Sequence, residues 1–112
     1  MSSKDVERIR ELNDSLRTSG LPHLGTWVMT QGVSSQGRGF IAKAIGLVRS
    51  YDTFTPGNDP HCEHDFGRFK IGDQTLYWKV DYYDLSLEYG SENPADPAVT
   101  HRVLTIMLAS EY

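Results

Sequence analysis

Two segments of the chain repeat apolar residues with a helical period. In residues 3–18 apolar side chains recur every three or four positions between charged ones, at Val6, Ile9, Leu12 and Leu16. Residues 40–51 repeat this spacing, with apolar positions at Ile41, Ala44, Ile45, Val48 and Tyr51. One apolar stripe per segment is typical of an amphipathic helix that packs against a core. The pattern therefore predicts helices over 3–18 and 40–51.

Three other segments have the character of strands. Residues 26–33 are rich in β-branched and aromatic side chains, which predicts a strand. Residues 66–71 and 74–83 flank a Gly-Asp pair that is typical of a hairpin turn. In 74–83 one face carries the core-type residues Leu76, Trp78, Val80 and Tyr82. The opposite face, which we expect to contact water, carries Thr75, Tyr77, Lys79, Asp81 and Tyr83.

A third helix is expected near the end of the sequence. Asp96 and Pro97 are favoured residues for a helix cap and a first helical position. The apolar positions that follow fit one stripe: Val99, Val103, Ile106 and Met107. The predicted fold is a single α+β domain over residues 1–112, with a small antiparallel sheet of about three strands packed with three helices. The strand over 26–33 fits beside either strand of the hairpin.

Charge is distributed unevenly along the chain. The net charge is −4, but residues 52–96 hold ten Asp and Glu against three Lys and Arg, a balance of −7. Residues 1–51 hold four acidic residues against seven basic ones, a balance of +3. An acidic region disfavours direct binding of nucleic acid or of an anionic membrane, because phosphate groups require a cationic surface. It favours a basic partner or a metal ion.

Cysteine content and hydropathy indicate the cellular compartment. Cys62 is the single cysteine, so no intramolecular disulfide forms. No apolar run approaches the roughly 18 residues of a membrane span. The charged first residues lack an apolar signal core. We therefore expect a cytoplasmic protein without a membrane partner.

Four blocks of sequence carry a family resemblance. They are FTPGNDPHCEHDFG at 54–67, WKVDYYD at 78–84, NPADPAVT at 93–100, and RVLTIMLA at 102–109 with the closing Glu-Tyr pair. Together they resemble an uncharacterised bacterial family, domain-of-unknown-function family 3768, over roughly residues 5–112. The resemblance implies no activity, although members often resemble cargo of mobile elements, where anti-defence genes are common. Cys62 stands where the family pattern has glycine, which weakens the case for an essential thiol.

The densest group of polar side chains allows a metal-binding interpretation. It consists of His61, Cys62, Glu63, His64 and Asp65. Imidazole, thiolate and carboxylate groups all bind zinc, and His23 or His101 would complete such a site. Adjacent residues rarely converge on one tetrahedral ion, however, and the sequence has no Cys-x-x-Cys or His-Glu-x-x-His motif. We therefore predict no metal and no cofactor.

The same loop allows an enzymatic interpretation. A small hydrolase-like enzyme centred on 59–65 would use His64 with Asp81 or Asp84 as acid and base, if the loop folds over the polar face of the hairpin. A Cys62 nucleophile would need a neighbouring histidine as base. The adjacent carboxylates oppose formation of its thiolate. Convergence of these side chains in one cleft would favour this alternative.

We favour a non-enzymatic protein-interaction module. Its acidic, aromatic middle region would imitate a row of phosphates and occupy the basic groove of a nuclease or another nucleic-acid-binding complex. Combined with the mobile-element resemblance, this hypothesis describes an anti-defence inhibitor. The expected partner-binding residues are Asp59, Glu63, His64, Asp65, Asp81, Tyr83, Asp84 and Glu88. A homodimer is left open.

Overall fold

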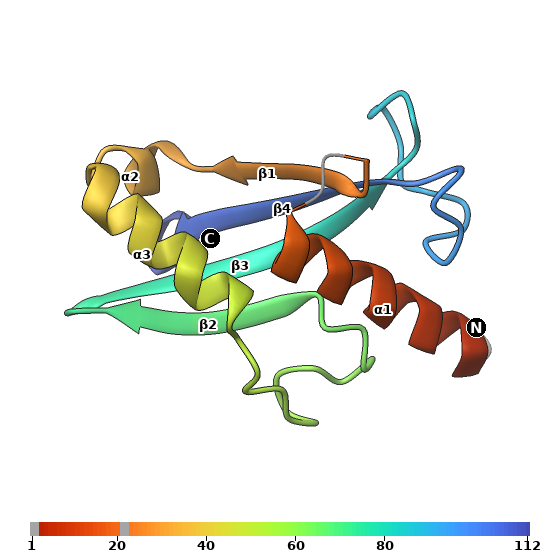
Figure 1. Ribbon diagram of the computed structural model, residues 1–112, viewed down its shortest axis with the longest axis horizontal. Helices are drawn as coiled ribbons and strands as arrows, with labels where there is room; N and C mark the ends of the chain where they lie inside the picture. The colour runs from red at the N-terminus through yellow and green to blue at the C-terminus, as the bar shows by residue number, and fades with distance from the viewer. Residues whose placement is uncertain (1–2, 21–22) are drawn as a thin grey trace.

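The computed structural model describes residues 3–20 and 23–112. Within them the chain forms, in order, α1 (Ser3–Ser19), β1 (Gly25–Met29), α2 (Gln31–Ser34), α3 (Arg38–Arg49), β2 (Phe66–Ile71), β3 (Gln74–Tyr83), β4 (His101–Leu108) and the 3-10 turn η1 (Ala109–Glu111). The strands form one sheet in the order β1-β4-β3-β2, as Figure 1 shows. The α+β class and the hairpin of β2 and β3 are confirmed.

The sheet differs from the expected one in strand number and direction. The described residues form four strands, and β1 runs parallel to β4, from Gly25 opposite Arg102 to Met29 opposite Ile106. β3 pairs antiparallel with both β4 and β2. The prediction of a three-stranded antiparallel sheet is therefore wrong. β1 pairs with neither strand of the β2–β3 hairpin. It pairs with β4, a segment for which the sequence pattern predicted a helix.

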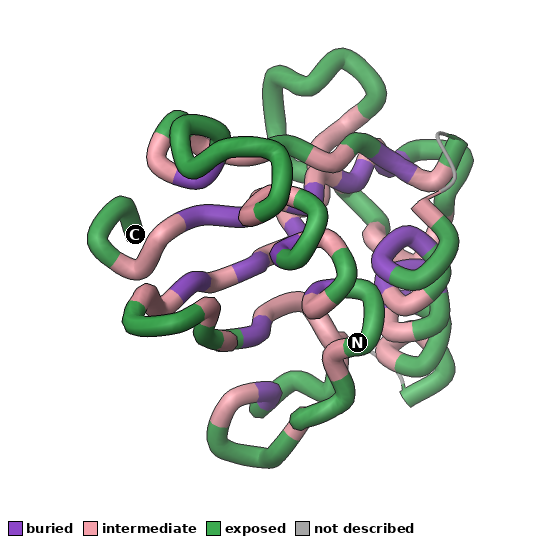
Figure 2. Tube along the Cα trace, turned by 60° about the vertical axis from the view of Figure 1, so that its left-hand side comes forward, coloured by how far each residue is buried: buried purple, intermediate pink, exposed green. Residues whose placement is uncertain are grey.

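The two longer helices, α1 and α3, cover one face of the sheet (Figure 1). The core between the layers contains the fully buried side chains of Leu16 on α1, Val48 on α3 and Trp78 on β3. Figure 2 shows burial concentrated in the strands and along one side of α1, while most of the connecting loops are exposed or only partly buried. No α-helix among the described residues covers the opposite face of the sheet. None of the described helices is long and apolar enough to cross a membrane.

The expected C-terminal helix is wrong, because residues 101–108 form β4. Burial along β4 has a period of two, with the inward positions Arg102, Leu104 and Ile106. Since an arginine occupies one core position, the apolar alternation is not visible in the sequence. Asp96 closes a turn instead of capping a helix, and its Oδ1 accepts a hydrogen bond from the Ala98 N–H at 2.9 Å.

The strand predicted over 26–33 is also too long, because Gln31–Ser34 forms α2. The cause is a contact with the far end of the chain. The Glu111 carboxylate accepts hydrogen bonds from the Thr30 hydroxyl at 2.6 Å and from the Gly32 N–H at 3.0 Å. These donors, the Thr30 hydroxyl first, lower the pKa of Glu111. The end of the chain therefore fixes the turn that follows β1.

Candidate functional site

The 52–65 loop packs against α1 through His64. The Nδ1 atom of His64 lies 2.9 Å from Oδ1 and 3.0 Å from Oδ2 of Asp14, while its Nε2 lies 3.7 Å from Oδ2 of Asp59. The imidazole stacks on the Phe54 ring with centroids 3.7 Å apart. Both ring nitrogens therefore face carboxylates, and the ring joins the loop to the helix.

Arg17 extends this contact to α3. Its Nη2 donates to Oδ1 of Asp14 at 3.0 Å, and its Nη1 donates to the carbonyls of Val48 at 2.9 Å and Tyr51 at 2.7 Å. The carbonyls at the end of a helix have no partner within the helix, so a buried guanidinium is well suited to bind them. Asp14 thus contacts both Arg17 and His64, which gives this group of residues a structural role.

Asp59 is a loop anchor rather than a surface residue. It is only 5% exposed, and its Oδ1 accepts hydrogen bonds from the backbone N–H of Glu63 at 3.1 Å and of His64 at 3.2 Å. A short carboxylate that binds amides a few residues ahead is a common way to fix a turn. Asp59 was expected to contact a partner, and its burial prevents direct contact.

A buried polar network lies behind this loop. The fully buried Asn13 donates from Nδ2 to the Glu63 carbonyl at 2.9 Å and to the Tyr82 hydroxyl at 2.8 Å, and its Oδ1 accepts from Arg102 Nε at 2.8 Å. The Tyr82 hydroxyl donates to the Glu63 carboxylate at 2.7 Å. Burial, followed by the bond to Glu63, raises the pKa of Tyr82 far above its ordinary value.

Arg102 is the most deeply placed charge of this network. Desolvation lowers its pKa from the ordinary arginine value, while Tyr82 and Glu63 oppose that shift. Its Nη2 also donates to the Pro94 carbonyl, and its guanidinium lies 5.2 Å from the centre of the Tyr82 ring. The predicted partner-binding residue Glu63 therefore serves chiefly as a hydrogen-bond acceptor inside the fold.

Cys62 and His64 border a hollow of about 300 Å³ that Phe54 and Arg10 also line. The exposed thiol makes no hydrogen bond to His64 among the described residues. The described part of the chain contains no group of three or more His, Cys, Asp or Glu placed to hold a metal ion. Cys62 has a φ of 57°, a conformation that glycine adopts without strain.

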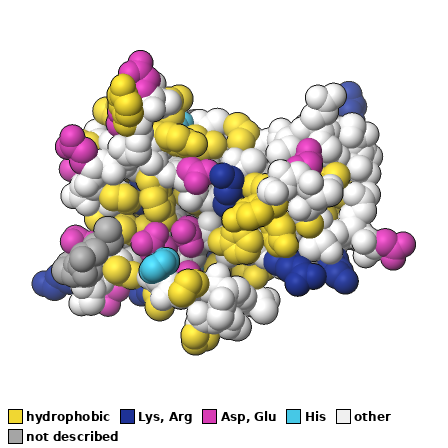
Figure 3. All heavy atoms as spheres, turned by 180° about the vertical axis from the view of Figure 1, so that it is seen from behind, with side chains coloured by type: hydrophobic (Ala, Val, Ile, Leu, Met, Phe, Trp, Pro, Cys, Tyr) yellow, Lys and Arg dark blue, Asp and Glu magenta, His cyan; other side chains and the backbone are white. Residues whose placement is uncertain are grey.

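The open face of the sheet carries three of the predicted residues. Asp65 and Asp81 line one hollow of about 370 Å³, and Asp81 and Tyr83 line a neighbouring one of about 440 Å³. Lys79 borders both and binds Asp81 with Nζ and Oδ2 2.8 Å apart. Figure 3 shows this face, on which charged side chains of both signs adjoin a group of hydrophobic ones. Desolvation, then the nearby Glu63, raises the pKa of Asp65.

An aromatic group continues the open face towards the last residue. Phe66 and Tyr77 have ring centroids 5.2 Å apart, and Tyr112 packs edge-on against both at 6.1 Å and 5.2 Å. Tyr112 was absent from the predicted site, because nothing in the sequence indicates that the end of the chain returns to the sheet. The polar and aromatic character predicted for this face of β3 is nevertheless observed.

The 84–92 loop, which follows β3, is a compact turn built around Asp84. The Asp84 Oδ1 accepts hydrogen bonds from the Ser86 hydroxyl at 2.8 Å and the Glu88 N–H at 3.1 Å. The Ser86 bond is the main cause of a lowered pKa for Asp84. Backbone bonds close the turn, with Asp84 N–H donating to the Tyr89 carbonyl at 2.8 Å. The loop presents large, exposed apolar side chains: Leu85 at 66%, Leu87 at 52% and Tyr89 at 72% exposure.

The structure divides the predicted residues into two groups. Asp59, Glu63 and His64 hold the loop on the helical side, whereas the outward-facing group is Asp65, Asp81, Tyr83, Asp84 and Glu88. His64 and Asp81 line different hollows, so the convergence that an acid–base pair requires is not observed between them. Sequence reasoning missed Leu85 and Leu87 as site residues, although apolar residues inside a polar loop were a usable signal.

The DUF3768 family model, described as a protein of unknown function, matches residues 29–111 of the chain. The chain therefore belongs to this family. No curated protein and no solved structure matches the chain.

Proposed function

We propose that this DUF3768 member is a non-enzymatic protein-interaction module that binds a basic, nucleic-acid-binding protein. The contact surface consists of the 84–92 loop together with the adjoining residues Asp65, Asp81 and Tyr83 of the open face. The partner is a nuclease or defence complex of the bacterial cytoplasm, and binding inhibits it.

The exposed apolar side chains of the 84–92 loop carry this proposal. Leu85, Leu87 and Tyr89 are each more than half exposed, although the backbone that holds them is already ordered by Asp84. Burying such side chains against a partner gains apolar transfer free energy and orders little additional chain. Leu85, Tyr89 and Val99 also border a hollow of about 410 Å³, which is suited to receive a partner's side chain.

The charges around the loop define the partner's chemistry. Asp84 and Glu92 line the same hollow, and the exposed Glu88 lies between them in sequence. Carboxylates at the rim of an interface attract a basic surface and mainly accelerate association, while the apolar centre determines how long the complex lasts. The two kinds of residue should therefore affect different rate constants.

Site-specific photo-cross-linking in the native host tests the proposal. Benzoylphenylalanine in place of Tyr89 should capture a basic nucleic-acid-binding protein, and added duplex DNA should compete with that capture. The same amino acid in place of the exposed Lys43 on α3 serves as the matched control. Absence of a product specific to position 89, or a product unaffected by duplex DNA, would overturn the proposal.

Kinetics with the captured partner then separate charge from apolar contact. Leu85→Ser/Tyr89→Ser should raise the dissociation rate at least tenfold, while Glu88→Lys/Glu92→Lys should mainly slow association. Glu7→Lys/Glu11→Lys on α1 changes the net charge equally and should leave association nearly unchanged. If the α1 variant slows association as strongly, a general charge effect replaces the proposed surface, and metal content and substrates around His64 become the next tests.

A further inference from the structure

β1 forms one edge of the sheet, and no backbone group of residues 3–20 or 23–112 pairs with its outer side. The Thr30 N–H donates to the Ile106 carbonyl of β4 at 3.1 Å. Consecutive residues of a strand direct their N–H and C=O groups to opposite sides. The backbone N–H and C=O of Val28 therefore point towards β4, whereas the backbone N–H and C=O of Trp27 and Met29 point away from the sheet. No strand among the described residues lies beyond this edge (Figure 1).

The two edges of the sheet differ in their protection. β2, at the opposite edge, carries the exposed cations Arg68 and Lys70, which discourage pairing with another strand. β1 has the sequence GTWVM, with no charge and no proline, and Val28 is 39% exposed. An unprotected edge with free backbone donors and acceptors is a template for an added strand.

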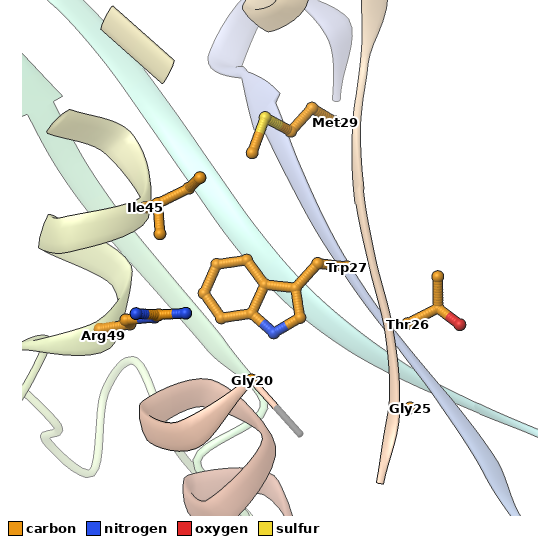
Figure 4. Close-up of a pocket in the computed structure, with 7 residues that line it drawn as sticks. All are labelled: Gly20, Gly25, Thr26, Trp27, Met29, Ile45 and Arg49. Atoms are coloured by element: carbon orange, nitrogen blue, oxygen red, sulfur yellow. The ribbon is translucent and has the colours of Figure 1, made fainter. Parts of the chain in front are cut away.

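An apolar groove accompanies the β1 edge on the helical side of the sheet. The hollow has a volume of about 410 Å³, and Trp27, Met29, Ile45 and Arg49 line it together with Gly20, Gly25 and Thr26. In Figure 4 the side chains of Trp27, Ile45 and Arg49 converge on the same space. The Trp27 Nε1 donates to the Leu16 carbonyl at 3.2 Å, which fixes the indole as one wall.

Arg49 gives this groove a positive charge. Its guanidinium lies 5.8 Å from the centre of the Trp27 ring, and no carboxylate of the described residues pairs with it. Residues 15–51 contain no Asp or Glu, while Arg38 and Lys43 are further exposed cations of α3. A second copy added through β1 would bring no acidic residue from its strand. Charge complementarity therefore favours an anionic strand from another protein.

We propose that the β1 edge binds an extended peptide segment of a partner, with an apolar and an acidic side chain two positions apart. The segment adds a strand beside β1 by bonding to the backbone of Trp27 and Met29. Its apolar side chain enters the groove against Ile45, and its carboxylate pairs with Arg49. This surface is separate from the 84–92 loop and does not rest on the proposed function.

Binding of the defined peptide acetyl-TVTETVT-amide tests this site. Side chains two positions apart share one face of a strand, so Val and Glu both face the groove. The amides of Trp27 and Met29 should gain protection from hydrogen exchange in the complex. The Val28 amide, which already faces β4, is the internal control. A peptide with N-methyl groups along its pairing edge should lose at least tenfold in affinity.

Arg49→Gln should weaken binding of the Glu peptide at least tenfold and leave binding of acetyl-TVTQTVT-amide unchanged. Lys43→Gln is the matched control, and it should alter neither peptide's affinity by more than about twofold. Three results would overturn the proposal. One is peptide binding that leaves Trp27 and Met29 unprotected. The second is Arg49-dependent binding of an oligothymidine strand in preference to the peptides. The third is self-association that protects the same two amides.

Discussion

Replacing Asn13 by alanine should be among the most damaging single changes in this protein. The side chain is fully buried and makes hydrogen bonds of 2.9, 2.8 and 2.8 Å to Glu63, Tyr82 and Arg102. Two of these bonds join neutral groups, and each contributes about 0.5–1.5 kcal/mol. The bond from the Arg102 guanidinium contributes about 1.5–3 kcal/mol. We therefore expect Asn13→Ala to lower the free energy of unfolding by about 4 kcal/mol.

Urea denaturation followed by tryptophan fluorescence measures this loss, provided that the slope of the unfolding free energy against urea stays constant. Tyr82→Phe loses the neutral bond from Asn13 and the bond to the Glu63 carboxylate, so it should cost about 3 kcal/mol. This variant keeps the test open if Asn13→Ala does not fold. Asn58→Ala is the control, since its side-chain bonds only order a local turn. Equal losses for Asn13→Ala and Asn58→Ala would refute the assignment of a stabilising network around Arg102.

Three further predictions test single features of the fold. The raised pKa of Asp65 means that its charged form destabilises the folded state, so the contribution of Asp65 to stability should become more favourable as the pH falls through that pKa. Asp65→Asn should therefore raise the melting temperature at pH 7, and an advantage that persists at pH 3 would contradict this account. Cys62→Gly should raise stability by up to about 1 kcal/mol, because glycine tolerates the φ of 57°. The variant should still capture the partner in the cross-linking assay, and loss of capture would show that the thiol is required for binding. Gly67→Ala should destabilise the protein by about 2–3 kcal/mol, because the added Cβ overlaps the Trp78 indole. A Cβ added at Gly46 meets nothing within 4 Å, so Gly46→Ala should instead stabilise α3 by about 0.5–1 kcal/mol. Chemical denaturation of both glycine variants checks this contrast, and similar values for the two would argue against the tight contact at Gly67.

Periodicity identified the elements in which side-chain pattern and burial agree. The stripe ending at Leu16 indicated α1, and the alternation of Leu76, Trp78 and Val80 indicated both β3 and its buried face. The pattern failed in β4, where Arg102 occupies a core position. The buried Arg102 is stabilised by hydrogen bonds to Asn13 and to the Pro94 carbonyl, and by its contact with the Tyr82 ring. Asn13 and Tyr82 are distant from Arg102 in the sequence, so a local pattern does not reveal this stabilisation.

For the site, the sequence by itself determined that chemistry-bearing residues concentrate in two loops and along the outer face of the hairpin. Only the tertiary structure decided which of them face outward. Asp59 and Asp65 are both loop carboxylates, but Asp59 turns inward to bind backbone amides, while Asp65 lines the open face. Residues 109–112 likewise pack back against the sheet. The Glu111 carboxylate binds the Gly32 N–H, so β1 is shorter than the sequence pattern predicts, and the Tyr112 ring packs on Tyr77. Local patterns record which side chains prefer burial, whereas contacts between distant segments determine which polar groups find partners inside.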